Sequence, residues 1–249
     1  MTRLLLKNGW KKVVRNTLVV SVVFSIIFSA IRGLGMLGPS SYRPLIPLGF
    51  LLMMALPFIF LNKDGRKQIG FVQSKKVSYY GLGILFGIVA ASICFGIGLL
   101  LFDTSPDNWF ITIRNYYNSS MPTAGIPIFQ LFVIFTIPPL IFSPIGEEIF
   151  FRGFLQEALT NRFSVRTSII LESLLFGLVH IFHHGLVRVD GVIHFYFWSG
   201  ILWVGLMFLT ACGFAILRKV SASIYPAIVA HATFNLMMNV FIFTFLFRP

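Results

Sequence analysis

The sequence predicts an all-α, polytopic membrane helix bundle, and three observations support this fold class. Of the 249 residues, 57% are hydrophobic and only 11% are charged, whereas soluble domains carry about 25% charged residues. The mean hydropathy is +0.86. Seven apolar runs approach the roughly 20 residues that a helix needs to cross a bilayer core. We therefore expect a single membrane domain over 1–249, and not a soluble, disordered, collagenous or nucleic-acid-binding protein.

The seven runs are predicted to be seven transmembrane helices, at about 17–37, 44–62, 79–102, 128–148, 167–183, 193–217 and 222–247. An eighth helix results if 193–217 divides in two. The first run follows a basic stretch, but Arg32 comes directly after the small residues Ser29 and Ala30, so no convincing leader-peptide cleavage site is present. We expect the first run to remain as an uncleaved span.

The distribution of Lys and Arg predicts the orientation in the membrane. With the N-terminus inside, fourteen basic residues fall on the inner side: Arg3, Lys7, Lys11, Lys12, Arg15, Lys63, Arg66, Lys67, Lys75, Lys76, Arg162, Arg166, Arg218 and Lys219. Four fall on the outer side: Arg43, Arg114, Arg188 and Arg248. The positive-inside rule therefore predicts a cytoplasmic N-terminus and an external C-terminus, in the plasma membrane if the protein is bacterial. Anionic lipids are the expected partner of the net charge of +12.

Three local patterns predict how the spans are built. Small residues at intervals of four in the third span, Gly83, Gly87 and Ala91, favour close approach of another helix. The acidic, aromatic and Pro-containing segment 103–127 is expected to form an interfacial loop or re-entrant cap. Three prolines, Pro138, Pro139 and Pro144, are expected to interrupt the fourth span, with a new helix starting at Ser143-Pro144.

Acidic residues in apolar spans are costly and are therefore candidates for function. Four of the eight acids lie in or beside the spans, namely Glu147, Glu148, Glu157 and Glu172. Glu148 and Arg152 stand four residues apart and share a helix face, so we expect them to form an ion pair. Glu147 points about 100° away from that pair and is expected to be free for chemistry. The alternative is that Glu147, Glu148 and Arg152 form one structural salt-bridge cluster.

Two histidines are predicted to lie level with Glu147. If the turn after the fourth span is near Phe163, Glu147 is 16 residues before it and His180 is 17 residues after it. An antiparallel hairpin of helices then places both at the same height, roughly 25 Å from the turn. His231 and Asn235 are four residues apart on one face of the last span and reach the same layer. We expect water to reach this layer from the cytoplasmic side.

The set Glu147, His180, His231 and Asn235 has the chemistry to activate one water molecule. A carboxylate can take a proton, imidazoles can bind the water or a metal, and an amide can donate to an oxyanion. Such a set suits amide hydrolysis. The sequence contains no HExxH, G-x-S-x-G, GxGxxG or P-loop motif, so zincin, serine-hydrolase, dinucleotide-binding and NTPase functions have no support.

Three motifs in this order resemble those of the CPBP intramembrane proteases. Residues 147–152 (EEIFFR) resemble the EExxxR motif, residues 176–180 (FGLVH) resemble FxxxH, and residues 231–235 (HATFN) resemble HxxxN. This family includes the type 2 CAAX prenyl endopeptidases and bacteriocin-processing and self-immunity proteins. The resemblance covers about 128–240, which we expect to be the protease core, with 1–127 contributing spans one to three and the outer loop.

The resemblance implies a role for each motif residue. Glu147 would be the base, His180 would assist it, and His231 with Asn235 would form the side that binds the oxyanion. Glu148 and Arg152 would complete the first motif. The family does not settle whether a metal takes part. If one does, Glu147, His180 and His231 are the expected ligands of a divalent ion such as zinc, although an amide such as Asn235 is an unusual zinc ligand.

The remaining polar residues of the spans have open roles. Glu172 precedes His180 by eight residues, so it is expected either to tune His180 or to pair with Arg162 or Arg166 at the inner rim. The other histidines, His183, His184 and His194, are expected at the membrane interface, where they could also widen a metal site.

Three classes of function remain compatible with these residues. The first is an intramembrane endopeptidase that cleaves a membrane-embedded or lipidated peptide, which is what the family resemblance implies. The second is a proton-coupled transporter, because Glu and His in spans also build proton relays, although no inverted repeat is apparent. The third is a non-catalytic immunity or scaffolding protein of the same fold.

Overall fold

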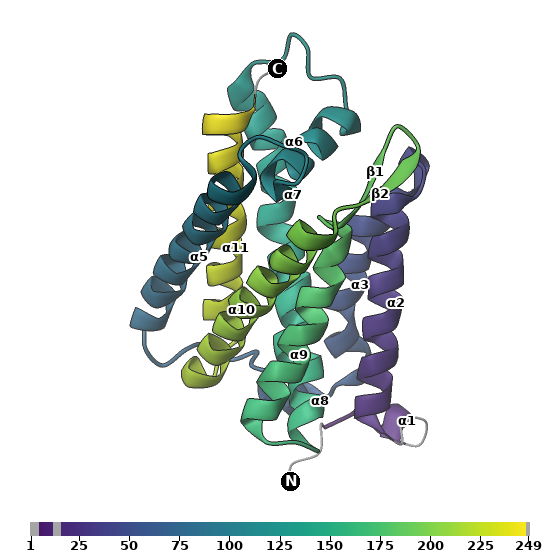
Figure 1. Cartoon of the computed structure of the whole chain (residues 1–249). Coiled ribbons are helices and arrows are strands. Elements are labelled where there is room, and N and C mark those ends of the chain that lie inside the picture. The colour runs from purple at the N-terminus through teal and green to yellow at the C-terminus, as the bar shows by residue number, and fades with distance from the viewer. Residues whose placement is uncertain (1–4, 12–15, 248–249) are drawn as a thin grey trace.

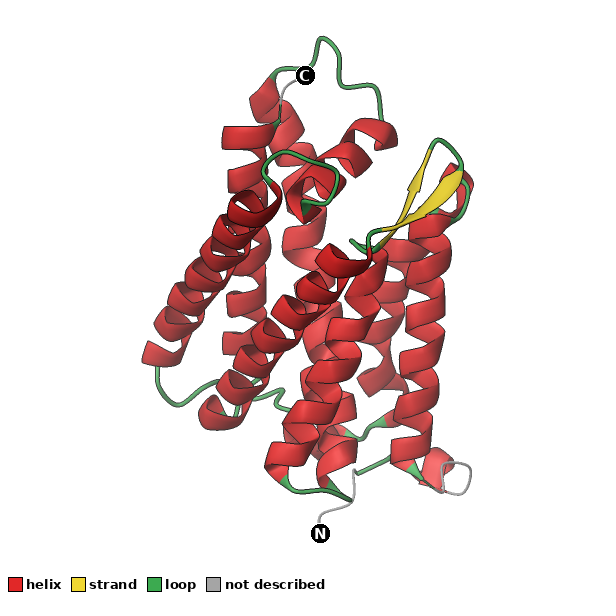
Figure 2. Ribbon diagram, in the orientation of Figure 1, coloured by secondary structure: helices red, strands yellow, loops and turns green. Residues whose placement is uncertain are grey.

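The computed structural model describes residues 5–11 and 16–247, and it is almost entirely helical (Figures 1 and 2). The elements in chain order are α1 (Asn8–Lys11), α2 (Thr17–Leu37), η1 (Ser40–Tyr42), α3 (Leu45–Phe60), α4 (Lys63–Gln68), α5 (Ser78–Phe102), α6 (Trp109–Ser120), α7 (Ile128–Glu147), η2 (Glu148–Leu155), α8 (Gln156–Thr160), α9 (Val165–Val179), η3 (His180–Phe182), β1 (Leu186–Val189), β2 (Val192–Phe195), α10 (Phe197–Ser221), α11 (Tyr225–Phe241) and η4 (Ile242–Leu246).

Seven helices in the described part of the chain are long and apolar enough to cross a membrane, and the predicted all-α polytopic bundle is confirmed. The sixth span is one uninterrupted helix, α10, so no eighth span arises by dividing 193–217. The described basic residues of the predicted inner side lie in or beside α1, α4, the start of α5, the α8–α9 turn and the end of α10. The residues Arg3, Lys12, Arg15 and Arg248 lie outside the described residues.

The small residues of α5 form the predicted contact with another helix. Gly83, Gly87 and Ala91 are buried, and they face α11. A Cβ atom added to Gly87 would lie 2.5 Å from the carbonyl oxygen of Ala230, which is closer than real Cβ contacts. The absence of a side chain thus lets α5 and α11 approach closely, and this contact supports α11, which carries His231 and Asn235.

Helix α7 continues through its three prolines, so the predicted interruption at Pro138, Pro139 and Pro144 is wrong. A proline cannot donate to the carbonyl four residues before it, and in a membrane the freed carbonyl needs another partner. The amide of Asn239 on α11 donates to the oxygen of Phe135 at 3.2 Å, which is the carbonyl that Pro139 leaves without a helical donor. Side chains of a neighbouring helix thus let α7 remain helical.

The helix changes its winding directly after Glu147. Residues Glu148–Leu155 form the π-helix η2, in which every residue is buried. Wide turns of this kind are rare and frequently occur at functional sites. Here the π-helix contains both Glu148 and Arg152.

The end of the bundle opposite the N-terminus is covered by α6 and by the β1–β2 hairpin (Figure 1). Helix α6 lies within the segment expected to form a cap, and its first turn, Trp109–Thr112, is buried. The hairpin was not predicted: residues 193–195 were assigned to the start of the sixth span, and 186–192 were left in the loop before it. Its turn, Asp190-Gly191, has positive φ angles of 49° and 84°, a conformation that Asp-Gly favours in two-residue hairpins. His194 lies in β2 and is exposed.

Candidate active site

The predicted site residues lie in four elements of the bundle: α7, η2, η3 and α11. Glu147 ends α7, Glu148 and Arg152 lie in η2, His180 begins η3, and His231 and Asn235 lie on α11. All are buried except Asn235, which is half-buried. Three structural features hold them: an ion-pair cluster, a histidine bridge and a polar contact between α7 and α11.

The ion-pair cluster contains Glu148, Arg152 and Glu172. Arg152 Nη1 lies 3.1 Å from Glu148 Oε1, as the spacing of four residues predicted. Arg152 Nε also lies 3.6 Å from Glu172 Oε1 on α9. All three side chains are fully buried. The expectation that Glu172 pairs with Arg162 or Arg166 is therefore wrong, because its cation is Arg152, which sits deeper in the bundle.

Aromatic rings enclose the arginine of this cluster. The guanidinium of Arg152 lies 4.1 Å from the ring centroid of Phe176 and 5.4 Å from that of Phe214. A cation over an aromatic face is stabilised by the ring quadrupole, and the effect is larger where water is excluded. The ring of His231 stacks on the other aromatic, Phe214, at 5.0 Å. Packing thus fixes both Arg152 and His231.

His231 joins the two glutamates of the first motif. Its Nδ1 lies 2.8 Å from Glu148 Oε1, and its Nε2 lies 3.7 Å from Glu147 Oε2. A carboxylate is an acceptor only, so the short contact to Glu148 places the ring proton on Nδ1. In neutral imidazole the other nitrogen, Nε2, is then an acceptor that faces a second acceptor, the Glu147 carboxylate. A donor such as water between them would satisfy both.

Glu147 has a partner that the sequence analysis missed. Its Oε1 forms an ion pair with Arg32 of α2, so the expectation that Glu147 is free of a cation is wrong. The alternative cluster of Glu147, Glu148 and Arg152 does not form either, because Glu147 pairs outside its own helix. The available signal was the charge itself: Arg32 is the one charged residue of the otherwise apolar helix α2, and such a residue is expected to have a buried partner.

His180 is buried at the C-terminal end of α9. Its Nδ1 lies 2.7 Å from the carbonyl oxygen of Phe176, which requires a proton on Nδ1 and leaves Nε2 as an acceptor in the neutral ring. Its ring also contacts that of His183 at 4.9 Å. Among the described residues, the ion-pair contacts of Glu147 are with Arg32 and His231, so a water shared between Glu147 and His180 stays a prediction.

Asn235 contacts the proline-containing helix. Its Nδ2 donates to the carbonyl oxygen of Pro139 at 2.8 Å. One of its two N–H groups is therefore used in a hydrogen bond that joins α11 to α7. Asn239, one turn further along α11, repeats the contact and accepts a hydrogen bond from the hydroxyl of Tyr117 at 2.8 Å. Sequence analysis missed Asn239, although its spacing of four from Asn235 placed it on the same helix face.

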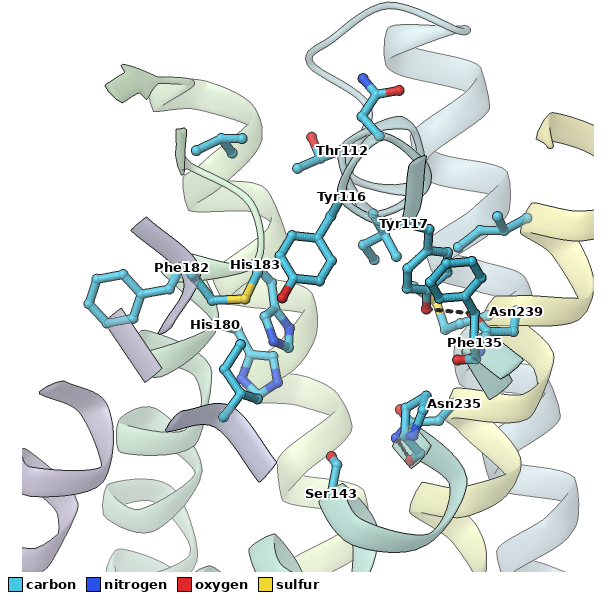
Figure 3. Close-up of a pocket in the computed structure, with 18 of the residues that line it drawn as sticks. Thr112, Tyr116, Tyr117, Phe135, Ser143, His180, Phe182, His183, Asn235 and Asn239 are labelled. Carbon is cyan, nitrogen blue, oxygen red and sulfur yellow. Dashed lines mark hydrogen bonds between the residues drawn. The ribbon is translucent and has the colours of Figure 1, made fainter. Parts of the chain in front are cut away.

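Part of the site borders a cavity of about 810 Å³ (Figure 3). Both imidazoles and both amides line it: His180, His231, Asn235 and Asn239. Glu147 does not line the cavity, but Ser143, one turn before it, does, and Ser143 Oγ lies 3.5 Å from Glu147 Oε2. The volume falls within the range of about 300 to 1,000 Å³ that is typical of ligand sites.

The cavity extends toward the end of the bundle that carries α6 and the hairpin. Its lining includes the exposed residues Asn118 of α6 and Arg188 and Asp190 of the hairpin. Both α6 and the hairpin lie opposite the N-terminal end (Figure 1). From the sequence, water is expected from the cytoplasmic side, taken as the N-terminal end, whereas the lining of this cavity reaches the opposite end.

The histidines expected at the interface take different positions. His183 lines the cavity. His184 is buried in a chain of hydrogen bonds in which Thr112 Oγ1 and Ser199 Oγ each lie 2.9 Å from one of its ring nitrogens. Burial lowers the pKa of His184 to about 4, against the opposing effect of Asp107. His184 is therefore a neutral structural contact between α6 and α10.

The residues expected as metal ligands do not form a metal site as they are placed. Within residues 5–11 and 16–247, no group of three or more His, Cys, Asp and Glu side chains is arranged to hold a metal ion. In addition, Glu147 gives one oxygen to Arg32, a cation that would oppose a second positive charge. The donor set Glu147, His180 and His231 thus does not fit a three-ligand zinc site in this arrangement.

Comparison with known families supports the resemblance that the motifs suggested. Residues 128–237 match the family model of the type II CAAX prenyl endopeptidase Rce1-like proteins. This segment contains all three motifs and runs from the start of α7 into α11. The three motifs thus lie within the matched segment, and the match supports a CAAX-type intramembrane protease at the level of the family. Neither curated proteins nor solved structures gave a match.

The buried cluster predicts a large stability effect for Arg152. Replacing Arg152 with Ala leaves Glu148 and Glu172 without their shared cation, and breaking a buried ion pair costs about 3 to 5 kcal/mol. Unfolding in detergent should show this loss of stability. The matched control is Arg166→Ala, which removes an exposed arginine from the first turn of α9 and should leave unfolding nearly unchanged. Equal unfolding of the two variants would contradict the role assigned to the cluster.

Proposed function

We propose that this protein is an intramembrane endopeptidase in which Glu147 activates a water molecule. The observation that supports the proposal most directly is the alignment of Glu147 Oε2 with His231 Nε2 at 3.7 Å, beside a cavity that both His231 and His180 line. A water that donates to both acceptors has its oxygen lone pairs directed away from them and toward a substrate in the cavity. Glu147 then takes the proton as the water attacks the carbonyl carbon.

Each neighbouring residue has a distinct task in this mechanism. Glu148, held by Arg152, accepts a hydrogen bond from the Nδ1–H of His231 and thereby sets its tautomer. His180 presents Nε2 as a third acceptor. Because both hydrogens of the water are directed at Glu147 and His231, this nitrogen suits an N–H group of the substrate. Asn235 retains one N–H group after its bond to Pro139, and this group suits donation to the oxyanion. This differs from the roles that the family resemblance implies. There His231 and Asn235 bind the oxyanion together, whereas here His231 assists Glu147 and Asn235 alone binds the oxyanion.

We propose a glutamate protease, in which no step of the reaction involves a metal ion. The pairing of Glu147 with Arg32 favours this subtype over a metalloprotease, because a carboxylate that already neutralises a guanidinium is a poorer metal ligand. Activity that disappears with a chelator and returns with one zinc ion per chain would overturn the subtype and leave the peptidase assignment standing.

The substrate class follows from the membrane location and the shape of the cavity. The cavity is lined by aromatic and aliphatic side chains together with many polar ones, among them histidines, asparagines and serines, and it lies within a bundle of spans. A peptide segment embedded in the membrane or attached to a lipid suits such a site. We propose that this segment enters between α6 and the β-hairpin, where the cavity reaches exposed residues. Anionic lipids are the proposed partners of the basic loops at the other end.

Glu147→Gln should abolish cleavage, and because it also removes the carboxylate partner of Arg32, folding of the variant is checked by its unfolding in detergent. The amide keeps the shape of the side chain but cannot take the proton of water, so general-base catalysis is lost, a factor of about 100 to 10,000. Because the substrate is unidentified, the measurement is quantitative proteomics of membranes from cells that express wild type or the variant. Uncleaved membrane peptides should accumulate in the Glu147→Gln cells.

The control for this comparison is Glu157→Gln. Glu157 lies on α8 and is within 3.9 Å of Lys219 near the N-terminal end of the bundle, so its variant makes the same chemical change away from the cavity. It should give the wild-type peptide pattern. If Glu147→Gln also gives that pattern, the protein is not a peptidase of this mechanism, and the transporter or non-catalytic immunity functions are favoured.

The orientation proposal makes a separate prediction. With the basic loops in the cytoplasm, the cavity opens to the outer side. In a background without Cys94 and Cys212, a cysteine at Ser143 should react with a charged thiol reagent only from outside sealed vesicles. A cysteine at Lys67, which is exposed on α4, should react only from inside. Reaction of both cysteines from one and the same side, or reversal of the two sides, would contradict the proposed arrangement.

A further inference from the structure

Arg32 is an unusual residue for its position. It lies in α2, where the other residues are apolar or small, and it is only 5% exposed. An arginine in a membrane span is costly unless it is paired or reaches water. Its carboxylate partner is Glu147, the residue proposed as the base. The ion pair thus joins α2, which lies outside the matched segment 128–237, to the centre of the site.

Packing around the pair fixes the position of both groups. The guanidinium of Arg32 lies 5.3 Å from the ring centroid of Phe50 on α3. Gly146, directly before Glu147, lies against the backbone of the same residue: a Cβ atom there would be 2.8 Å from the carbonyl oxygen of Phe50. Phe50 therefore contacts the arginine through its ring and the glutamate segment through its backbone. Helices α2, α3 and α7 meet at this point.

The two oxygens of Glu147 have different surroundings as a result. Oε1 contacts Arg32, whereas Oε2 lies near Ser143 and His231. Ser143 and His231 line the cavity, but Arg32 does not. The ion pair therefore holds one oxygen away from the cavity, and the other is directed toward the groups that border it.

We propose that Arg32 is a positioning residue for hydrolysis, which holds Glu147 by Oε1 so that Oε2 faces His231 and the water to be activated. This inference rests on the proposed function and assigns part of the site to the N-terminal spans. Catalysis depends strongly on placement, because an error of about 1 Å in the position of a reacting group can cost about 100-fold in rate. Arg32 does not contact the substrate and acts through Glu147.

The kinetic test uses the peptide that accumulates in Glu147→Gln membranes as the substrate of purified enzyme. Arg32→Gln should lower kcat about 100-fold with little change in KM, because the cavity that binds the peptide is intact. Arg32→Lys keeps the charge but not the planar fork of donors, and it should give an intermediate kcat. A wild-type kcat for Arg32→Gln would overturn the proposal.

The matched control is Arg218→Gln. Arg218 is an equally buried arginine, 5% exposed, that donates to the carbonyl oxygen of Gln68 at 2.8 Å and does not line the cavity. Its loss should lower stability without lowering kcat of the folded enzyme. If Arg218→Gln reduces kcat as much as Arg32→Gln does, the effect of Arg32 is a general effect of losing a buried arginine and the proposal fails.

A second readout does not depend on activity. Dicyclohexylcarbodiimide is an apolar reagent that modifies carboxylic acid groups in apolar surroundings and spares carboxylates in ion pairs. Mass spectrometry should find Glu147 protected in wild type and Arg32→Lys, and modified about tenfold more or higher in Arg32→Gln, because a buried ion pair has been broken. Equal modification of Glu147 in wild type and Arg32→Gln would overturn the pairing.

These measurements separate the two proposals. If Glu147→Gln cleaves as wild type does, the proposed function fails whatever the labelling shows. If Glu147→Gln is inactive, Arg32→Gln is labelled at Glu147 and yet retains the wild-type kcat, the positioning role alone fails and the ion pair is structural.

Discussion

The arrangement of the site depends on one constraint: a charge buried in an apolar bundle has to find a partner on another helix. Arg32 meets Glu147, His231 lies between Glu147 and Glu148, and Arg152 contacts Glu148 and Glu172. This continuous chain of polar contacts runs through α2, α7, η2, α9 and α11. Because each break would leave a buried charge uncompensated, segments more than a hundred residues apart in sequence are held at one place.

The same ion pairs determine which atoms of His231 and Glu147 face each other. Glu148 is held on one side by Arg152 and therefore holds the Nδ1 proton of His231, so Nε2 is presented toward Glu147. Arg32 holds the far oxygen of Glu147. Two acceptors are thus directed at one location beside the cavity, which is where a water molecule can be oriented. The paired glutamates of the first motif accordingly serve different purposes: one fixes the imidazole and the other receives the proton.

The backbone of α7 shows how the cavity is built beside these charges. Prolines deprive the helix of internal hydrogen bonds near Phe135, and Asn239 replaces the missing donor from α11. Asn235 adds a contact to Pro139. Both amides also line the cavity, so the contacts that stabilise the proline-rich segment lie on the wall of the site. Tyr117 on α6 extends this polar wall through its hydroxyl group.

The sequence predicts the seven spans well, because length and hydropathy are local properties. It also predicts the Glu148–Arg152 pair, because a spacing of four residues places both groups on one helix face. It did not predict the partner of Glu147, since the pairing of Arg32 with Glu147 depends on how α2 packs against α7. Glu172 was assigned to the wrong arginines for the same reason. The continuity of α7 was missed because the replacement donors come from α11, about a hundred residues later. The hairpin was missed because most of its second strand was assigned to the sixth span, which left the first strand in a loop without a partner.

The central claim is that Glu148 fixes His231 with its proton on Nδ1, so that Nε2 faces Glu147. The most direct test is ¹⁵N NMR of protein labelled in its five histidines, with the His231 signals assigned by their loss in His231→Asn. Neutral His231 with a protonated Nδ1 and a bare Nε2 is the result expected. In Glu148→Gln, whose amide can also donate to the ring, this preference should weaken. A proton on Nε2 and a bare Nδ1 in the wild-type protein would contradict the account.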